Sequence, residues 1–324
     1  MGKRALIAVT AFSAIVWIIL FWIVPLPVII LTVIAWIVLL IFNKELGAKI
    51  LFIASASAAV IAVGLICVFL FAQGIPAMLD IGVLNFLTGT DWRPTWNPPL
   101  YGILPMIAGS LYVTAGAILF GVPVGIFAAV FMAKFCPRRI HKVLKPAINL
   151  LAGIPSVVYG YFGMVVLVPF VRENFGGNGN SILTASMLLG MMILPTIITI
   201  SEHAIRAVPP EIYDGAVALG ASHESATFKA VLPAAKSGVT ASVILGIGRA
   251  VGETMAVRMV AGNQAVMRMP HEFLSGTRTL TSNVVIELGY AYGDHRAALI
   301  ATGVVLFAFI LLINTMFMRI RGRK

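Results

Sequence analysis

The sequence predicts an all-α protein that crosses a membrane many times, and three observations support this fold class. Hydrophobic residues make up 60% of the 324 positions and charged residues only 11%, whereas roughly 25% of residues are charged in soluble domains. Several apolar stretches contain 18 or more residues, the length that a helix needs to span a bilayer. Spanning segments must pair every backbone polar group internally, and stretches of this length favour helices over barrel strands.

We predict eight membrane-spanning helices from these stretches. They cover residues 5–24, 25–42, 51–72, 105–133, 147–171, 183–201, 239–260 and 297–318. The first two form an N-terminal hydrophobic hairpin within residues 1–47, for which one long or re-entrant segment is the alternative. The other six form a transmembrane domain over residues 48–324. A cleaved signal peptide is disfavoured, because Val24–Pro27 leads directly into the second apolar run.

The basic residues are distributed unevenly between the ends of the predicted spans. With an even number of spans, one side of the membrane carries both termini and sixteen Lys and Arg residues, and the other side carries five. Because cytoplasmic loops are enriched in Lys and Arg, we predict that both termini are cytoplasmic. This distribution also explains the formal net charge of +11, so we expect membrane lipid and no nucleic acid as a partner.

The seventh predicted span contains two ionisable residues, Arg249 and Glu253, in an otherwise apolar run. A charged side chain at the centre of a membrane helix costs about 2.5–3.5 kcal/mol on insertion scales. Residues four apart lie on one helix face, where opposite charges partly neutralise each other. We therefore predict that this face lines a polar path for a charged substrate. A structural ion pair that only orients helices is the alternative.

The sequence shows no catalytic or metal-binding set. His223-Glu224 and His271-Glu272 lack the second histidine of a zinc-protease helix, and no Walker-type phosphate-binding loop occurs. Cys67 and Cys136 do not fit a metal-ligand spacing. We therefore predict a transport subunit without catalytic residues, metal or cofactor, and place any ATP hydrolysis on a separate polypeptide.

Three smaller features have open interpretations. Residues 77–87 are expected to form a short interfacial helix, and Trp92 and Trp96 beyond it are interpreted as interfacial anchors in preference to substrate contacts. Gly153-Ile-Pro-Ser156 is expected to interrupt its helix, either to line a pathway or as a packing kink. Two glycine pairs, Gly248 with Gly252 and Gly121 with Gly125, are expected to let a neighbouring helix approach closely.

Residues 202–238 form the largest polar segment on the predicted cytoplasmic side. Pro209-Pro210 can start a short helix, because proline lacks only an N–H that the first turn leaves unpaired, and Gly220 can end it. A second short helix is expected from about residue 222 to 231. Two short helices rich in small residues suit a docking element for another protein, and a solvated connector is the alternative.

This segment resembles the EAA loop of ABC importer permeases. Asp214-Gly-Ala-Val-Ala-Leu-Gly220 is followed, after nine residues, by Ala230-Val-Leu-Pro233. Ala216, Gly220, Leu232 and Pro233 are identical to the motif, whereas Asp214, Gly215 and Ala230 replace its Glu, Ala and Ile. In that family the loop seats in a groove of the ATPase subunit. The resemblance therefore implies a pair of ATP-binding subunits as partner and these residues as the coupling loop.

Four further segments resemble the phosphate-specific importer, and its C-type permease subunit most closely. They are Phe86–Pro94, Tyr101–Pro105, Gly153–Gly160 and Gly248–Val257. The resemblance covers roughly residues 48–320, and the added hairpin departs from its six-span pattern. It implies a permease that forms half of the path for inorganic phosphate in the inner (cytoplasmic) membrane. An A-type permease and an extracytoplasmic phosphate-binding protein are the implied partners.

The same resemblance implies that Arg249 and Glu253 act in phosphate passage. We interpret Glu253 as a group that holds Arg249 between substrates. Two other functions stay open. A permease for sulfate or molybdate would keep the docking loop but carry different charges in the Gly248–Val257 segment. A secondary transporter would not need the loop and would respond to an ion gradient.

Overall fold

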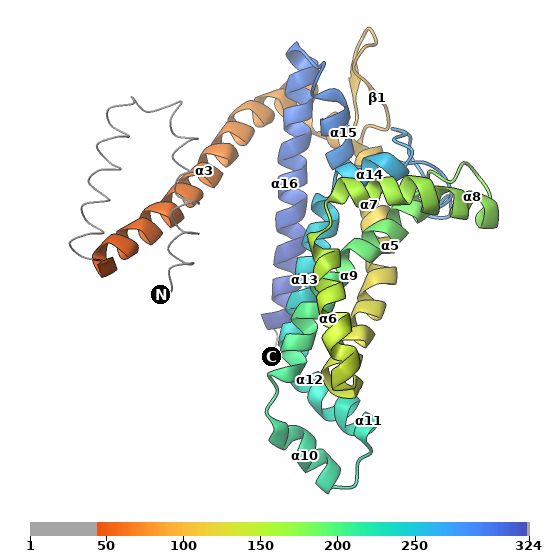
Figure 1. Ribbon diagram of the computed structural model, residues 1–324. Coiled ribbons are helices and arrows are strands. Elements are labelled where there is room, and N and C mark those ends of the chain that lie inside the picture. The colour runs from red at the N-terminus through yellow and green to blue at the C-terminus, as the bar shows by residue number, and fades with distance from the viewer. Residues whose placement is uncertain (1–43, 323–324) are drawn as a thin grey trace. The chain divides into compact units, whose positions relative to one another are not determined.

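The computed structural model of the chain describes residues 44–322, so the predicted spans at 5–24 and 25–42 lie outside the described residues. The chain divides after Leu70 into two compact units. The described part is mainly helical, with three π-helical turns and one antiparallel hairpin formed by β1 (Trp92–Arg93) and β2 (Leu100–Tyr101) (Figure 1).

The first unit contains, within the described residues, the beginning of helix α3 (Lys44–Ile81). Most of its side chains are apolar and exposed, among them Phe52 and Val60. The helix is long and apolar enough to cross a membrane, as predicted for residues 51–72. Exposed apolar side chains along such a helix fit lipid or a second subunit better than water.

The second unit is a bundle centred on α9 (Ile182–Arg206), which packs along α5 (Leu104–Val130) and α13 (Lys236–Gly252). The most apolar window of α9 is 67% buried, against 33% for that of the span formed by α5, so α9 is the central helix. Gly121 and Gly125 lie directly against α9. Their predicted role in close helix packing is confirmed.

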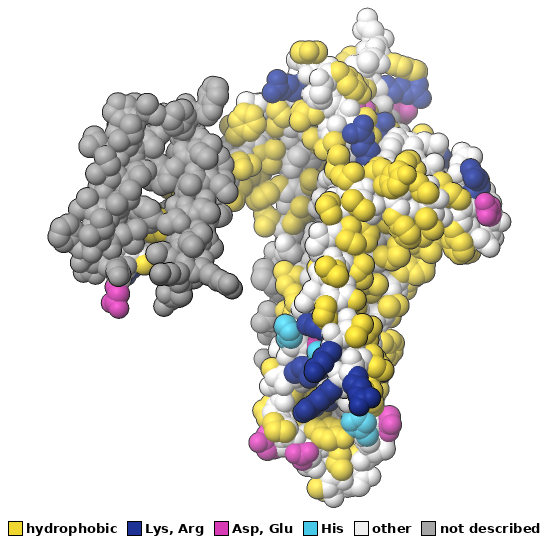
Figure 2. Space-filling view, viewed as in Figure 1, with side chains coloured by type: hydrophobic (Ala, Val, Ile, Leu, Met, Phe, Trp, Pro, Cys, Tyr) yellow, Lys and Arg dark blue, Asp and Glu magenta, His cyan; other side chains and the backbone are white. Residues whose placement is uncertain are grey.

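Shorter elements complete the second unit. They are α4 (Val83–Thr88), η1 (Phe131–Phe135), α6 (Arg138–Gly153), α7 (Ser156–Phe162), η2 (Gly163–Leu167), α8 (Val168–Phe175), α10 (Pro210–Ala218), α11 (His223–Ala226), η3 (Thr227–Val231), α12 (Leu232–Ala234), α14 (Met255–Val260), α15 (Leu280–Glu287) and α16 (Gly293–Gly322). Figure 2 shows hydrophobic side chains over the middle of this unit and Lys and Arg gathered toward its two ends. That distribution is typical of a membrane-crossing unit.

Five described helices are long and apolar enough to span a membrane. A sixth span arises if the bent pair formed by residues 223–234 and 236–252, at 71° to each other, counts as one. By length and composition, the described residues supply five spans, or the six predicted for the core if this pair is one span.

The predicted continuous span over residues 239–260 is wrong. Helix α13 ends at Gly252, Glu253 has an extended backbone with ψ 130°, and α14 begins at Met255. The residues on both sides of the break are apolar, so hydropathy does not reveal it. A polar side chain satisfies the interrupted backbone, as described below for Glu253.

The predicted span over residues 147–171 begins too early. Helix α6 ends at Gly153, and the structure restarts as α7 at Ser156. The candidate span is Ser156–Phe175. The predicted interruption at 153–156 is confirmed, and Pro155 explains it because proline cannot donate a backbone hydrogen bond within a helix.

The segment before α5 also differs from the prediction. Helix α3 continues to Ile81, and Gly82 with φ 87° separates it from α4, so no single helix covers residues 77–87. Trp92 is buried, being only 6% exposed, and is not an interfacial anchor. Trp96 is exposed, and the Arg93 guanidinium lies 4.0 Å from the centre of its ring.

Candidate functional site

The break between α13 and α14 carries both residues predicted for the substrate path. Arg249 lies on the last turn of α13, and Glu253 begins the break. One carboxylate oxygen of Glu253 accepts hydrogen bonds from the backbone N–H of Thr254 at 3.1 Å and of Ala256 at 3.2 Å. The first N–H groups of a helix have no partner within it, so Glu253 caps α14. This capping satisfies backbone groups that a bilayer would leave unpaired.

Hydroxyl groups hold the same break from the other side. The Thr281 hydroxyl donates to the backbone carbonyl of Glu253 at 3.1 Å. The start of α15 is itself tied to α5, because the Leu280 N–H donates to the Ser110 hydroxyl at 3.0 Å. Thr254 donates through its hydroxyl to the Gly252 carbonyl at 3.3 Å. The break is therefore a fixed, hydrogen-bonded feature of the bundle.

A small cavity of about 10 Å³ lies beside the Glu253 side chain. Four hydroxyl residues contribute to its lining, namely Ser110, Thr114, Thr279 and Thr281. Such a space holds about one water molecule. In this conformation the polar interior next to Glu253 is too small for an oxyanion.

Arg249 is half-buried, and its guanidinium makes no hydrogen bond or ion pair with the described residues. The ion pair with Glu253 that the four-residue spacing predicts is not formed, because the helix ends between the two residues and backbone amides occupy the carboxylate. Gly248 and Gly252 have open space where a side chain would begin, so no described helix packs against them. This face of α13 presents a cation and two glycines to the outside of the chain.

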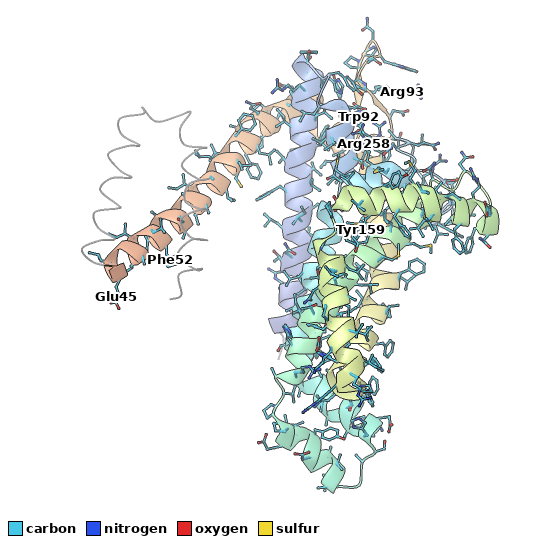
Figure 3. All side chains as sticks on the ribbon, in the orientation of Figure 1. Glu45, Phe52, Trp92, Arg93, Tyr159 and Arg258 are labelled. Atoms are coloured by element: carbon cyan, nitrogen blue, oxygen red, sulfur yellow. The ribbon has the colours of Figure 1, made fainter. Side chains whose placement is uncertain are left out.

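Tyr159 brings the second helix break close to Arg249. Its phenol donates to the Leu151 carbonyl at 2.9 Å, across the interruption between α6 and α7. The Arg249 charge lies near enough to interact electrostatically with the phenol. Figure 3 shows Tyr159 at the α6–α7 turn, whereas Trp92 and Arg93 lie at the hairpin end of the unit.

The two broken helices also touch directly. Helix α7 packs against α14, and a side chain at Gly160 would come within 3.0 Å of the Ala256 backbone. The interruption at 153–156 therefore lies beside the interruption at Glu253. Such close packing is compatible with both interpretations of the first break, a pathway lining and a packing kink.

The segment predicted as a coupling loop forms two short helical parts, as expected. The N–H groups of Gly220 and Ala221 donate to the carbonyls of Val217 at 2.9 Å and Ala216 at 3.1 Å. This is the Schellman pattern that ends a helix, and Gly220 occupies its left-handed position with φ 89°. Glycine is needed there because other residues rarely adopt this conformation.

The second part of the loop begins at Ser222, whose hydroxyl accepts from the Ser225 N–H at 3.2 Å and caps α11. The helix continues through η3 and α12, where Leu232 and Pro233 occupy the first turn of α12. The expected helix over 222–231 is confirmed, and it extends to Ala234.

The tip of the loop exposes apolar side chains to solvent. Leu219 is 91% exposed, and Ile212 and Val217 on α10 are also exposed. Asp214 and Gly215 lie on the same short helix and are exposed as well. Apolar side chains concentrated on a small exposed helix are typical of a surface that binds another protein.

Two buried carboxylates carry ion-pair clusters that the sequence analysis missed. Glu287 pairs with Arg278 at 2.6 Å and with His295 at 2.8 Å, and accepts the indole N–H of Trp92 at 2.8 Å. Glu202 is the centre of the second cluster. Trp92 lies 195 positions from Glu287, so no local pattern in the sequence predicts this contact.

Comparison with known families gives a direct match. The model of the family described as "Binding-protein-dependent transport system inner membrane component" matches residues 121–323. The chain belongs to this family. It is therefore a multi-pass inner-membrane permease subunit and not an enzyme. Its partners are an ATPase, which is a separate subunit in such systems, and a substrate-binding protein.

Curated relatives of this inner membrane component include two bacterial permeases. The chain is 42% identical over 258 residues to the probable ABC transporter permease protein YqgH of Bacillus subtilis, covering 77% of this chain and 83% of the relative. It is 33% identical over 295 residues to the phosphate transport system permease protein PstC of Mesorhizobium japonicum, covering 83% and 89%.

Solved structures confirm the permease fold. The chain resembles a subunit of a bacterial alginate ABC transporter with a TM-score of 0.59 and 14% identity, covering 86% of this chain and 96% of that one. It also resembles a subunit of the inward-facing MetNI methionine ABC transporter with a TM-score of 0.53 and 19% identity, covering 68% and 95%. At such low sequence identity, these similarities show a shared fold and nothing about the substrate.

Proposed function

We propose that this chain is the C-type permease subunit of an ATP-driven importer of inorganic phosphate, and that Arg249 binds the anion as it passes. The observation that carries the proposal is the Arg249 guanidinium, which lies beside two broken helices and has no hydrogen-bond or ion-pair partner in the described part of the chain. The similarity to permeases named for phosphate transport supports the choice of substrate.

The chemistry of Arg249 suits an oxyanion. A guanidinium presents a planar fork of N–H donors and stays charged in a poorly hydrated site. Its hydrogen bonds to phosphate are charge-assisted and stronger than neutral ones. An arginine already paired with a carboxylate would have to lose that partner first, whereas Arg249 pairs with no carboxylate among residues 44–322.

In this proposal Glu253 shapes the path and does not neutralise Arg249. Its carboxylate holds the start of α14, and Thr281 holds its carbonyl. The break therefore fixes where the last turn of α13 ends and where Arg249 lies. Broken helices with fixed ends are a common way for transporters to build a site at membrane depth.

The proposal assigns each partner to a part of the chain. An A-type permease would cover the open face of α13 at Gly248 and Gly252 and complete the path. The pair of ATP-binding subunits would dock on the coupling loop through Asp214, Gly215, Ala216, Gly220, Leu232 and Pro233. An extracytoplasmic phosphate-binding protein would deliver phosphate at the opposite end, and both termini would be cytoplasmic.

Radiolabelled phosphate uptake tests this proposal. Uptake is measured at low external phosphate in cells with and without the gene, after other phosphate carriers have been removed. We expect uptake that needs the gene and persists in excess sulfate and molybdate. Uptake that is independent of the gene would reject phosphate as the substrate, and uptake abolished by sulfate or molybdate would favour a different oxyanion.

A further inference from the structure

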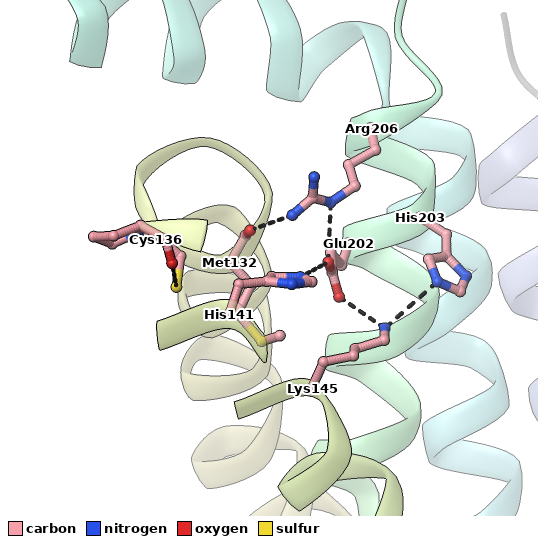
Figure 4. Close-up of polar contacts among 8 residues, drawn as sticks. Met132, Cys136, His141, Lys145, Glu202, His203 and Arg206 are labelled. Atoms are coloured by element: carbon pink, nitrogen blue, oxygen red, sulfur yellow. Dashed lines mark hydrogen bonds and ion pairs between the residues drawn. The ribbon is translucent and has the colours of Figure 1, made fainter. Parts of the chain in front are cut away.

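A second ionisable cluster lies outside the proposed path, at the end of the bundle that carries the coupling loop. Its centre is Glu202 on the last turns of α9, whose side chain is only 2% exposed. Figure 4 shows three cationic or potentially cationic side chains converging on this carboxylate. Burying a carboxylate is costly unless several partners compensate it, so Glu202 needs these partners to remain buried in the fold.

The partners of Glu202 come from two helices. One carboxylate oxygen contacts His141 Nε2 at 2.7 Å and Arg206 Nε at 2.9 Å. The other accepts from Lys145 Nζ at 2.8 Å. His141 and Lys145 lie on α6, and Arg206 is the last residue of α9. The cluster therefore locks the two helices together one turn before the loop begins.

Arg206 extends the cluster to a third segment. Its second nitrogen, Nη2, donates to the backbone carbonyl of Met132 in η1 at 2.7 Å. The Cys136 N–H bonds to the Phe131 carbonyl, and Pro137 has no N–H to donate to Met132. Arg206 thus donates to a carbonyl in the last turn of this helix and ties the end of the α5 span to Glu202.

The helices of the coupling loop contact the same π-helical turn. Lys134 of η1 lies 5.1 Å from the ring centre of Tyr213 on α10. The Phe135 ring of η1 lies 4.6 Å from the His223 ring of α11, tilted by 59°, and His223 is hydrogen-bonded to Tyr213. Both helical parts of the loop therefore contact η1.

The segment that leaves the loop packs against the end of α5, just before η1. Val231 and Ala235 are buried in an apolar cluster with Ala129 and Val130, the residues just before η1. Ile205 of α9 belongs to this cluster as well. The entry to the loop, its helices and its exit thus all meet the end of the α5 span.

We propose that Glu202 is a positioning residue for energy coupling. It fixes Arg206 and the basic face of α6 so that the coupling loop, η1 and the ends of α5, α6 and α9 move as one body when the ATPase closes. A packed, hydrogen-bonded unit transmits such rigid-body motion, whereas a loosely attached loop would absorb it. The proposal rests on the proposed function in one respect, the docking of the ATPase on this loop.

The test uses the complete importer in proteoliposomes, with the second permease, the ATPase pair and the binding protein. ATP hydrolysis is measured with and without substrate-loaded binding protein, together with phosphate uptake. Glu202→Gln keeps the size of the side chain and removes its charge. Glu173→Gln on α8 is the matched control, because Glu173 is exposed and belongs to neither cluster.

We expect Glu202→Gln to retain basal ATP hydrolysis. The stimulation of hydrolysis by the loaded binding protein should fall roughly fivefold or more, which is the lower end of usual coupling effects. Uptake should fall in parallel with the stimulation, and Glu173→Gln should behave as wild type. Stimulation of Glu202→Gln that equals the control, or an equal fall of basal and stimulated hydrolysis, would overturn the proposal.

If Glu202→Gln does not assemble, Arg206→Lys tests the same coupling proposal. Lysine keeps a cation beside Glu202 but cannot reach Met132 at the same time, so assembly should persist while stimulation falls. If an assembled Arg206→Lys complex were stimulated as strongly as wild type, the proposed coupling role of the Glu202–Arg206–Met132 contacts would be wrong. A wild-type complex that is stimulated but moves no phosphate would reject the proposed substrate and leave this test intact.

Discussion

The Glu253 side chain accepts a hydrogen bond from the Ala256 backbone N–H at 3.2 Å, across the point where the seventh predicted span breaks. This contact changes the meaning of the Arg249–Glu253 spacing. Four residues apart on a continuous helix, the two side chains would neutralise each other. Because the carboxylate caps the next helix instead, it does not pair with the arginine, and the backbone of the break stays hydrogen-bonded.

This relationship predicts different outcomes for two substitutions at Glu253. Glu253→Gln keeps an oxygen that can accept from the Thr254 and Ala256 amides, whereas Glu253→Ala removes the cap at a cost of about 1 kcal/mol. We expect Gln to preserve most phosphate uptake and Ala to reduce it, as measured in membranes with matched permease levels. Equal losses in both variants would instead indicate that the negative charge itself is required.

Tyr159 should be sensitive to loss of its hydroxyl. Tyr159→Phe removes the hydrogen bond to the Leu151 carbonyl across the α6–α7 break, at a cost of about 1 kcal/mol. We expect a lower midpoint of thermal unfolding for the purified complex and weaker uptake. Tyr161→Phe is the control, because Tyr161 lies on the same helix and is exposed. A similar unfolding midpoint in the two variants would show that the Tyr159 hydroxyl does not stabilise the α6–α7 break.

The exposed Leu219 should be needed for ATPase docking. Leu219→Asp places a charge on an apolar tip that is 91% exposed, so the fold should tolerate it while the contact with a partner should not. We expect the ATPase subunits to be lost when the permease is purified by affinity, and Leu219→Met to retain them. Full recovery of the ATPase with Leu219→Asp would show that docking uses another surface.

Two glycines of the coupling loop should respond in opposite directions to alanine. Gly220 has φ 89°, so Gly220→Ala should destabilise the loop by about 1–2 kcal/mol. Gly215 lies inside α10 with open space around it, so Gly215→Ala should stabilise the helix by about 0.5–1 kcal/mol. Hydrogen exchange of the loop amides in the purified complex measures both, and increased protection in Gly220→Ala would contradict the assignment.

The spans of the core could be predicted because hydrophobic length is a local property of the sequence. The run around α5 and the run around α9 are apolar enough that their ends fall within a few residues of the prediction. The coupling loop could also be predicted, because Pro210 and Gly220 act on the helix that contains or adjoins them.

The interruption at Glu253 could not be predicted, because apolar residues flank it and its spacing from Arg249 imitates a helical ion pair. The partners of Glu202 on α6 lie 57 and 61 positions away, and their pairing depends on how α6 packs against α9. Trp92 illustrates the same limit, since its burial requires Glu287 from a distant helix. Long-range pairing is set by tertiary packing and leaves no periodic signal in the sequence.

The most direct test of the account compares phosphate uptake by Arg249→Gln with uptake by Arg258→Gln, at equal levels of assembled importer. Arg249 lies on the last turn of α13, whereas Arg258 lies on α14, beyond the break, and is exposed. We predict that Arg249→Gln lowers uptake at least about tenfold, because losing a hydrogen bond to a charged group costs about 1.5–3 kcal/mol, while Arg258→Gln transports as wild type. Uptake by Arg249→Gln that equals uptake by Arg258→Gln would contradict the central claim that Arg249 binds the passing phosphate.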